Sequence, residues 1–272
     1  MSPGANPVPP PAGAPARPAA APSRRVRRKR LLREYAETVL FAILAALVAR
    51  AFVVETFRIP TASMLPALQA GDHVLVSKLS YALRAPFSGR TLVRWAEPRR
   101  GDVVVFDHRA RGGETWVKRV VGVPGDVVKL EAQVLYINGV AQPRERVGPV
   151  VVEEQSSATG TWWTESCFLW RERLARDGPA TGDPVAHGVV QCREPAADQR
   201  EGPFEVVKPG HVFVVGDSRD RSEDGRSGGG WQVPVDDVEG KAVRVLWSWG
   251  PDGARAGSRV RLRADRLFKP VE

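Results

Sequence analysis

The sequence has few of the residues from which metal sites and histidine-based catalytic sites are built. Among its 272 residues there are only two cysteines and four histidines. No H-x-x-x-H or C-x-x-C spacing suggests a metal site, so we expect neither a metal nor a cofactor. A G-x-S-x-G elbow is also missing, which argues against an α/β-hydrolase. The histidines are scattered, at His73, His108, His187 and His211, and we expect them to be structural or solvated instead of forming a catalytic triad.

Long apolar runs are equally scarce, and only one approaches the length of a membrane span. It runs from Thr38 to Val54 and is interrupted by Arg50. A bilayer core requires about 20 apolar residues, with roughly 17 as the lower limit, and the run reaches this if the Arg50 side chain extends to the interface. We therefore predict one transmembrane anchor over residues 35–56. A cleavable secretory signal, a buried core helix and an amphipathic surface helix stay open as alternatives.

The net charge of +9 is concentrated near the N-terminus. Residues 1–34 contain eight basic residues and one acidic residue, and residues 1–23 are mostly Pro, Ala and Gly. This composition predicts a disordered basic tail over 1–34, and its charge places the tail in the cytoplasm by the positive-inside rule. Only two net positive charges remain for the rest of the chain, which argues against a nucleic-acid partner.

After residue 56 the chain consists of short, Val-rich runs between Gly, Pro and Asp, a pattern typical of β-strands. We predict a mostly β fold, with an antiparallel catalytic domain built from residues 57–140 and 205–272. The polar segment 141–204 shows little strand signal and is predicted to be an inserted subdomain. It contains both cysteines, Cys167 and Cys192, which either form a disulfide in an oxidising compartment or remain free thiols.

Four motifs carry the candidate chemistry. They are P-T-A-S-M-L-P at 60–66, R-G-D-V-V-V-F at 100–106, W-V-K-R-V-V-G-V-P-G-D at 116–126 and G-D-S-R-D-R-S-E-D-G-R at 216–226. A serine hydroxyl is a weak nucleophile that needs a base within hydrogen-bonding distance. A lysine can be that base only if burial lowers its pKa from the ordinary value of about 10.4.

Lys118 is a candidate for such a shift. In a strand, alternation places it on one face with Trp116 and Val120, and places Val117 and Arg119 on the other face. Apolar neighbours on its own face would favour the neutral amine. A solvated lysine whose stem covers apolar surface is the alternative interpretation.

In this order after an N-terminal anchor, the four motifs resemble the type I signal peptidase family. The resemblance covers roughly residues 35–130 and 205–250. It implies that Ser63 is the nucleophile, Lys118 the general base, Thr61 a hydroxyl that helps to bind the oxyanion, and Ser222 a serine that orients the lysine. It further implies a supporting ion pair between two residues, Asp224 and Arg226, and shallow substrate pockets lined by six apolar residues, Phe57, Ile59, Met64, Leu68, Trp116 and Val117.

The chain departs from the family pattern at four places. Ser218 stands where the family usually has Asn, Gly225 replaces a Ser, Ala67 replaces a Thr, and the glycines 228–230 lengthen the approach to Trp231. None of these changes affects the proposed nucleophile or base.

The resemblance implies a serine endopeptidase that removes signal peptides from exported proteins after small residues at positions −1 and −3. Its partners would be preprotein signal peptides and the lipid bilayer, and we expect a monomer. It would be a single-pass protein of the bacterial inner membrane, with the catalytic domain on the periplasmic face. Two alternatives stay open: a related Ser–Lys protease with another task, and a non-catalytic, membrane-tethered β domain that binds extended peptides.

Overall fold

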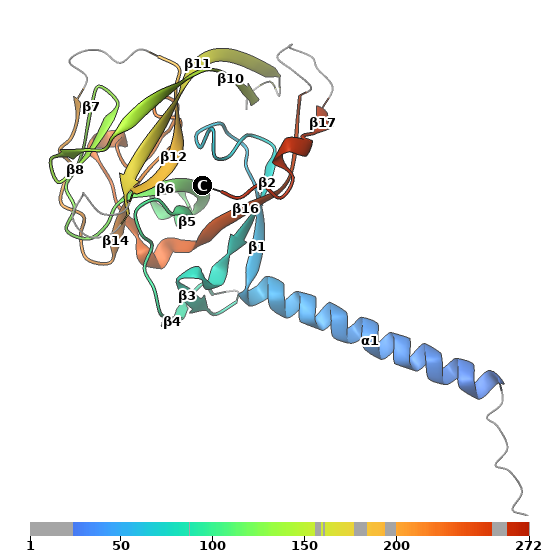
Figure 1. Cartoon of the computed structure of the whole chain (residues 1–272). Coiled ribbons are helices and arrows are strands. Elements are labelled where there is room, and N and C mark those ends of the chain that lie inside the picture. Colours follow the sequence, from blue (N-terminus) through green and yellow to red (C-terminus); the bar gives the residue numbers. More distant parts are fainter. Residues whose placement is uncertain are drawn as a thin grey trace, which may run out of the picture. The chain divides into compact units, whose positions relative to one another are not determined.

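The protein is described by a computed structural model of residues 24–86, 88–155, 159, 161–176, 184–193, 200–251 and 260–271. The chain divides into two compact units, Met1–Leu47 and Val48–Glu272. The first unit contains most of helix α1 and the second contains all of the strands. Figure 1 shows the elements of each unit.

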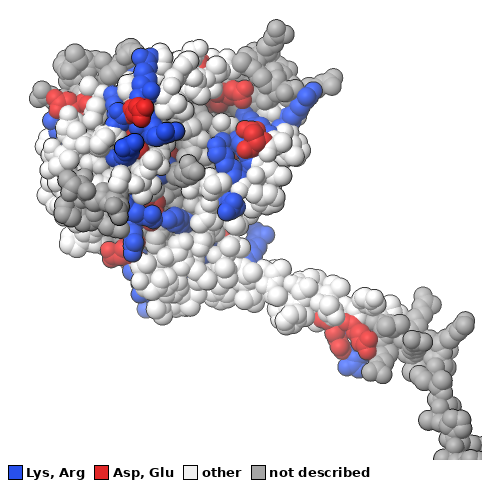
Figure 2. Space-filling model, viewed as in Figure 1, with Lys and Arg blue, Asp and Glu red and all other residues white. Residues whose placement is uncertain are grey.

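Helix α1 extends from Arg24 to Phe52. It contains no Gly or Pro and is rich in Ala, Leu and Arg, which are strong helix formers. Its segment Leu32–Phe52 is long and apolar enough to cross a membrane, although a signal sequence near an N-terminus meets the same criterion. In Figure 2 most of the helix surface that is not grey is free of charged residues. Arg33 and Glu37 form an ion pair near the start of this segment.

Two predicted boundaries at this end of the chain are wrong. The helix begins at Arg24, so residues 24–34 are helical and do not belong to a disordered tail. The basic side chains that suggested a tail are also good helix formers. The helix ends at Phe52 and β1 begins at Val54, so the predicted span 35–56 extends too far. The rest of the predicted tail, residues 1–23, lies outside the described residues.

The second unit is mostly β, and every pairing between its strands is antiparallel. This confirms the predicted fold class. The largest sheet has the strand order β1-β2-β16-β5-β6-β14-β15, with β17 paired to β16. Its strands are β1 (Val54–Arg58), β2 (Asp72–Ser77), β5 (Val103–His108), β6 (Glu114–Gly122), β14 (His211–Val215), β15 (Val233–Pro234), β16 (Val238–Pro251) and β17 (Val260–Leu262).

Three smaller sheets accompany it. The three-stranded sheet contains β10 (Arg144–Gln155), β11 (Trp162–Ala175) and β12 (Pro184–Gln191). The four-stranded sheet contains β13 (Arg200–Glu201), β7 (Val128–Glu131), β8 (Val134–Ile137) and β9 (Val140–Ala141). The two-stranded sheet contains β3 (Ala82–Arg84) and β4 (Thr91–Arg94). Short 3-10 helices are η1 (Lys78–Ser80), η2 (Arg109–Arg111), η3 (Ser227–Gly229), η4 (Val235–Asp237) and η5 (Ala264–Arg266).

Segment 141–204 differs from its sequence-based description. Although the sequence shows little strand signal there, the segment contains β10 and β11, two of the three longest strands in the described part of the chain. The predicted disulfide is present, since Cys167 and Cys192 are bonded at 2.03 Å. It joins β11 to the residue that follows β12.

The core lies on both faces of the large sheet, and β5 shows this most clearly. Val103 and Val105 pack in one apolar cluster, whereas Val104 and Phe106 pack in another. Strand β6 alternates in the same way, because Val117 contacts the first cluster and Trp116 the second. The alternation predicted around Lys118 is therefore confirmed.

The Gly-Asp steps of the sequence form turns, as expected from the residue types. Asp72, Asp102 and Asp126 each accept a hydrogen bond from a backbone N–H three residues earlier. The same carboxylates also pair with cations, for example Asp72 with Arg266 at 2.5 Å and Asp126 with Arg100 at 2.6 Å. These turns anchor the loops that flank the candidate site.

Candidate active site

The first two predicted site residues lie in direct contact. Ser63 lies in the loop between β1 and β2, and Lys118 lies in the middle of β6. These strands are labelled in Figure 1. Lys118 Nζ lies 2.9 Å from Ser63 Oγ, although 55 residues separate the two in sequence. This distance is within the range that proton transfer between a nucleophile and its base requires.

Lys118 is buried, with only 5% of its surface exposed. Burial disfavours the ammonium and lowers the pKa of Lys118 to about 8, while the negative charges of Asp224 and Asp217 act in the opposite direction. The Trp116 ring lies 5.3 Å from Lys118 Nζ and covers one side of the amine. A substantial fraction of the lysine is therefore neutral near pH 8 and can accept a proton.

Thr61 lies beside Ser63, as the family motif implied. Its Oγ1 is 3.3 Å from Ser63 Oγ, and its side chain is exposed to solvent. A hydroxyl here can donate a hydrogen bond to an oxyanion that forms next to Ser63.

Ser222 approaches the site from the loop after β14, but its hydrogen bonds differ from those implied. Its hydroxyl donates to the carbonyl oxygen of Glu223 (3.4 Å) and interacts with Asp224, so in the described structure its partners do not include Lys118. Gly216 allows Ser222 to lie close to Ser63. A Cβ at Gly216 would lie 2.1 Å from Ser222 Oγ and 2.6 Å from the Ser63 carbonyl oxygen, so only glycine fits between them.

Asp224 and Arg226 form a buried, bidentate ion pair. Arg226 Nε and Nη2 donate to the two Asp224 oxygens at 2.7 and 2.9 Å. Burial alone would raise the pKa of Asp224, but hydrogen bonds and the charge of Arg226 hold it below its ordinary value. Asp224 also accepts a hydrogen bond from the Gly216 N–H at 2.8 Å. The pair thus holds the loop on which Ser222 lies.

A cleft of about 450 Å³ opens beside Ser63 and Lys118. Five of the six predicted wall residues line it, and they are Phe57, Ile59, Met64, Trp116 and Val117. Leu68 does not, because the turn in which the Leu68 N–H binds the Met64 carbonyl directs it into the core. Leu68 is fully buried in the cluster beneath the loop, so its prediction as a wall residue is wrong.

The cleft also has charged walls, which the sequence analysis missed. They come from Arg58, Glu114, Glu154, Arg221 and Glu223. Arg221 bridges the 216–226 loop to the β10–β11 hairpin, where it pairs with Glu154 at 2.9 Å. Glu154 belongs to the inserted segment, and no local sequence pattern connects it with Ser63.

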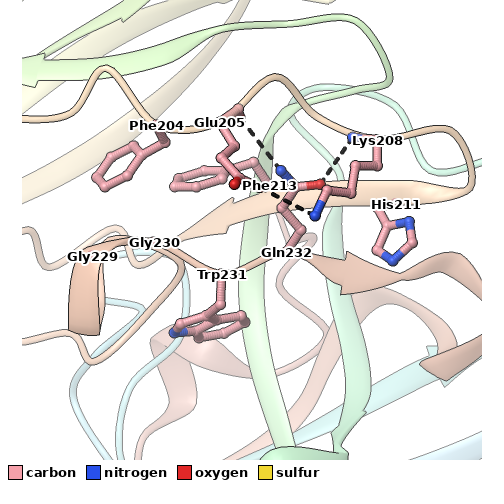
Figure 3. Close-up of a pocket in the computed structure, with 9 residues that line it drawn as sticks. All are labelled: Phe204, Glu205, Lys208, His211, Phe213, Gly229, Gly230, Trp231 and Gln232. Carbon is pink, nitrogen blue, oxygen red and sulfur yellow. Dashed lines mark hydrogen bonds and ion pairs between the residues drawn. The ribbon is translucent and has the colours of Figure 1, made fainter.

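A second pocket, of about 290 Å³, contains none of the predicted site residues (Figure 3). Gln232 hydrogen-bonds the backbone around it, including the Lys208 N–H at 2.9 Å. Lys208 forms an ion pair with Glu205, so both of these charges are already compensated. We assign the pocket no part in the chemistry.

On the face of the second unit (Val48–Glu272) shown in Figure 2, basic and acidic residues lie side by side.

Comparisons with known proteins identify the family of the chain. The model of the family "Signal peptidase, peptidase S26" matches residues 32–247. A signal peptidase I from Pseudomonas aeruginosa is 33% identical over 239 residues, covering 84% of this chain and 76% of that protein. One from Pseudomonas fluorescens is 32% identical over 237 residues, covering 83% and 76%.

A crystal structure of a signal peptidase I from Enterococcus faecalis V583 is 25% identical and covers 53% of this chain and 96% of that chain. Its TM-score of 0.28 is too low to support an argument about the fold. The family model and the Pseudomonas relatives are sufficient, because each spans most of the chain, including the serine, lysine and 216–226 motifs. The chain therefore belongs to the type I signal peptidase family, peptidase S26.

Proposed function

We propose that this chain is a membrane-anchored serine endopeptidase that removes N-terminal signal peptides by means of a Ser63–Lys118 dyad. The observation that carries the proposal is the 2.9 Å contact between Lys118 Nζ and Ser63 Oγ in an open cleft. The burial of Lys118 supports it, because only a lysine with a lowered pKa can act as the base near neutral pH.

In the proposed mechanism, neutral Lys118 accepts the hydroxyl proton as Ser63 Oγ attacks the carbonyl carbon of the residue at −1. The Thr61 hydroxyl and the Ser63 N–H stabilise the oxyanion, and each such donor is worth roughly 2.7–4 kcal/mol in other proteases. Protonated Lys118 then gives its proton to the leaving amine. In the second half, Lys118 deprotonates a water that hydrolyses the acyl-enzyme and restores free Ser63.

The strand edges beside the cleft suit an extended substrate. β1 pairs only with β2, and residues Glu114–Lys118 of β6 pair only with β5 among the described strands. The four successive antiparallel pairings between them give β1 and β6 the same direction. A substrate segment can add to these free edges as a strand, which aligns its carbonyl with Ser63.

The apolar walls explain the proposed preference for small residues at −1 and −3. Ile59 and Met64 are buried, and Trp116 and Val117 are half-buried, so the walls have little freedom to retract. A large side chain would have to displace them, which costs about 1–3 kcal/mol in packed protein interiors. Such a cost corresponds to roughly a tenfold loss in rate or more.

We further propose that α1 anchors the enzyme in the bacterial inner membrane as a single-pass, monomeric protein. The apolar segment Leu32–Phe52 supports the span, and the basic residues before it support a cytoplasmic N-terminus. The catalytic unit then lies on the periplasmic face, where signal peptides of exported preproteins reach it.

The test is cleavage of one precursor by the purified full-length chain in detergent. The precursor carries Ala, Ser, Val, Leu or Phe at −1, and cleavage is followed by the mass of the products. We expect efficient cleavage after Ala and Ser and at least a tenfold slower reaction with Leu and Phe. Equal cleavage of the Ala and Phe precursors would refute the signal-peptide specificity even if Ser63 remained essential.

A further inference from the structure

The inserted three-stranded sheet lies directly behind the loop that carries Ser63. Ala62 and Leu65, on either side of Ser63 and Met64, pack in one buried cluster with Val152, Cys167 and Val190 of this sheet. Ala62 is fully buried and Leu65 is 5% exposed. The loop therefore rests on the insertion as well as on the catalytic sheet.

Gly188 of β12 lies close against this loop. A Cβ at position 188 would lie 2.4 Å from Pro66 Cγ and 3.1 Å from Pro66 Cδ. The backbone of Gly188 is that of an ordinary strand residue, so no left-handed conformation requires glycine there. Proximity to Pro66, three residues after Ser63, is what requires it.

β12 also binds the backbone of residues 217–219, and this segment in turn binds the backbone of Ser63. The Val190 N–H donates to Asp217 O (2.9 Å), and the Arg219 N–H donates to Val190 O (3.1 Å). Between them, the Ser218 N–H donates to the Ser63 carbonyl oxygen (3.1 Å). Ser218 is fully buried, so this connection from β12 to Ser63 is shielded from water.

Two buried links fix β12 and β11 relative to this segment. The Cys167–Cys192 disulfide joins β11 to the residue that follows β12, and both cysteines pack in the same cluster. Arg219 pairs with Glu172 of β11, and both side chains are 1% exposed or less. The insertion, the 217–219 segment and the Ser63 loop thus form one packed unit.

We infer that β12 of the insertion positions the nucleophile, with Gly188 as the positioning residue that sets the distance between the insertion and the Ser63 loop. The inference rests on the proposed role of Ser63. Because a close-packed interior has no room for an added Cβ at 188, Pro66 and its loop would be displaced by about 1 Å. A displacement of this size can lower the rate about 100-fold.

The experiment measures kcat and KM of the full-length Gly188→Ala variant on a precursor with Ala at −1. We expect kcat to fall tenfold to 100-fold, as a rough range, with a smaller change in KM, because the wall residues Phe57, Trp116 and Val117 lie in β1 and β6, outside the displaced loop. The control is Ala186→Ser on the same face of β12, where the side chain is exposed; it should keep wild-type kcat. Wild-type kcat in folded Gly188→Ala would overturn the inference.

A second variant tests the contact itself. Pro66→Ala removes the two ring carbons that the new Cβ would meet, so Gly188→Ala should lower kcat less than twofold in the Pro66→Ala background. This comparison also holds if Gly188→Ala alone fails to fold. A tenfold loss in that background would overturn the role of the Pro66 contact. Failure of the dyad is a separate result, since it would appear as activity in Ser63→Ala.

Discussion

The lowered pKa of Lys118 predicts how the rate depends on pH. Only the neutral amine can accept the Ser63 proton, so the rate should fall as pH decreases through a value of about 8. At pH 6, two units lower, roughly 1% of the lysine is neutral, so kcat/KM should be about 100-fold below its plateau. The assay is initial-rate cleavage of a precursor with Ala at −1 between pH 5.5 and 9.5.

The histidines provide the control for this prediction. Burial lowers the pKa of His73, His108 and His187. If one of them were the base, the fall in rate with decreasing pH (the acid limb of the pH–rate profile) would lie below the ordinary histidine pKa of about 6.5. Each of the four histidines, replaced singly by Gln, should leave the limb near pH 8. A limb below pH 6.5, or one that disappears with any histidine, would refute lysine as the base.

Substitution of Asp224 should shift the acid limb of the pH–rate profile. Its charge raises the pKa of Lys118 against the effect of burial. Asp224→Asn removes that charge and leaves Arg226, whose charge lowers the pKa of Lys118, with Glu201 as its remaining carboxylate partner. Both changes act in the same direction, so the limb of the folded variant should lie at lower pH than that of the wild type. A shift to higher pH would show that the electrostatics of the site are different.

Three further predictions concern the pocket walls, the topology and one departure from the family motif. Ile59→Ala or Val117→Ala enlarges the cleft and should permit cleavage of precursors with Val or Leu at −1, measured as product masses; unchanged selectivity would exclude these side chains as walls. Protease added to spheroplasts should digest the chain after residue 57 and spare the N-terminal tail, and protection of the catalytic unit would invert the proposed topology. A Cβ at Gly225 would lie 2.8 Å from the Val214 carbonyl oxygen, so Gly225→Ser should lower the free energy of unfolding by about 1–3 kcal/mol in a denaturant titration; unchanged stability would show that the loop adapts.

The pairing of Ser63 with Lys118 was implied by the resemblance to the family, whereas the fold class and the surroundings of Lys118 could be predicted from sequence because each has a local signal. Val-rich runs between turn residues predicted the strands, and alternation around Lys118 predicted its apolar neighbour Trp116. All of these features depend on residues close together in the chain.

The features that were missed depend on distant partners. Strand β11 contains charged residues such as Glu172, which is buried because Arg219, 47 residues away, neutralises it. The polar composition of β11 therefore gave little strand signal, although the strand packs in the core. Leu68 was placed in the cleft because it matches a wall position of the family, but the turn at Met64 directs it inward. The start of α1 was missed because a run of arginines favours both helix and disorder.

The most direct test of the central claim is to remove each member of the dyad and both together. Purified Ser63→Ala, Lys118→Ala and the double variant are compared with wild type on one precursor, after circular dichroism has established that each is folded. Each single variant should lose at least about a thousandfold in kcat/KM, and the double variant should be no slower than the slower single, because the two residues act as one unit. Substantial cleavage by folded Lys118→Ala, or losses that multiply in the double variant, would contradict the account.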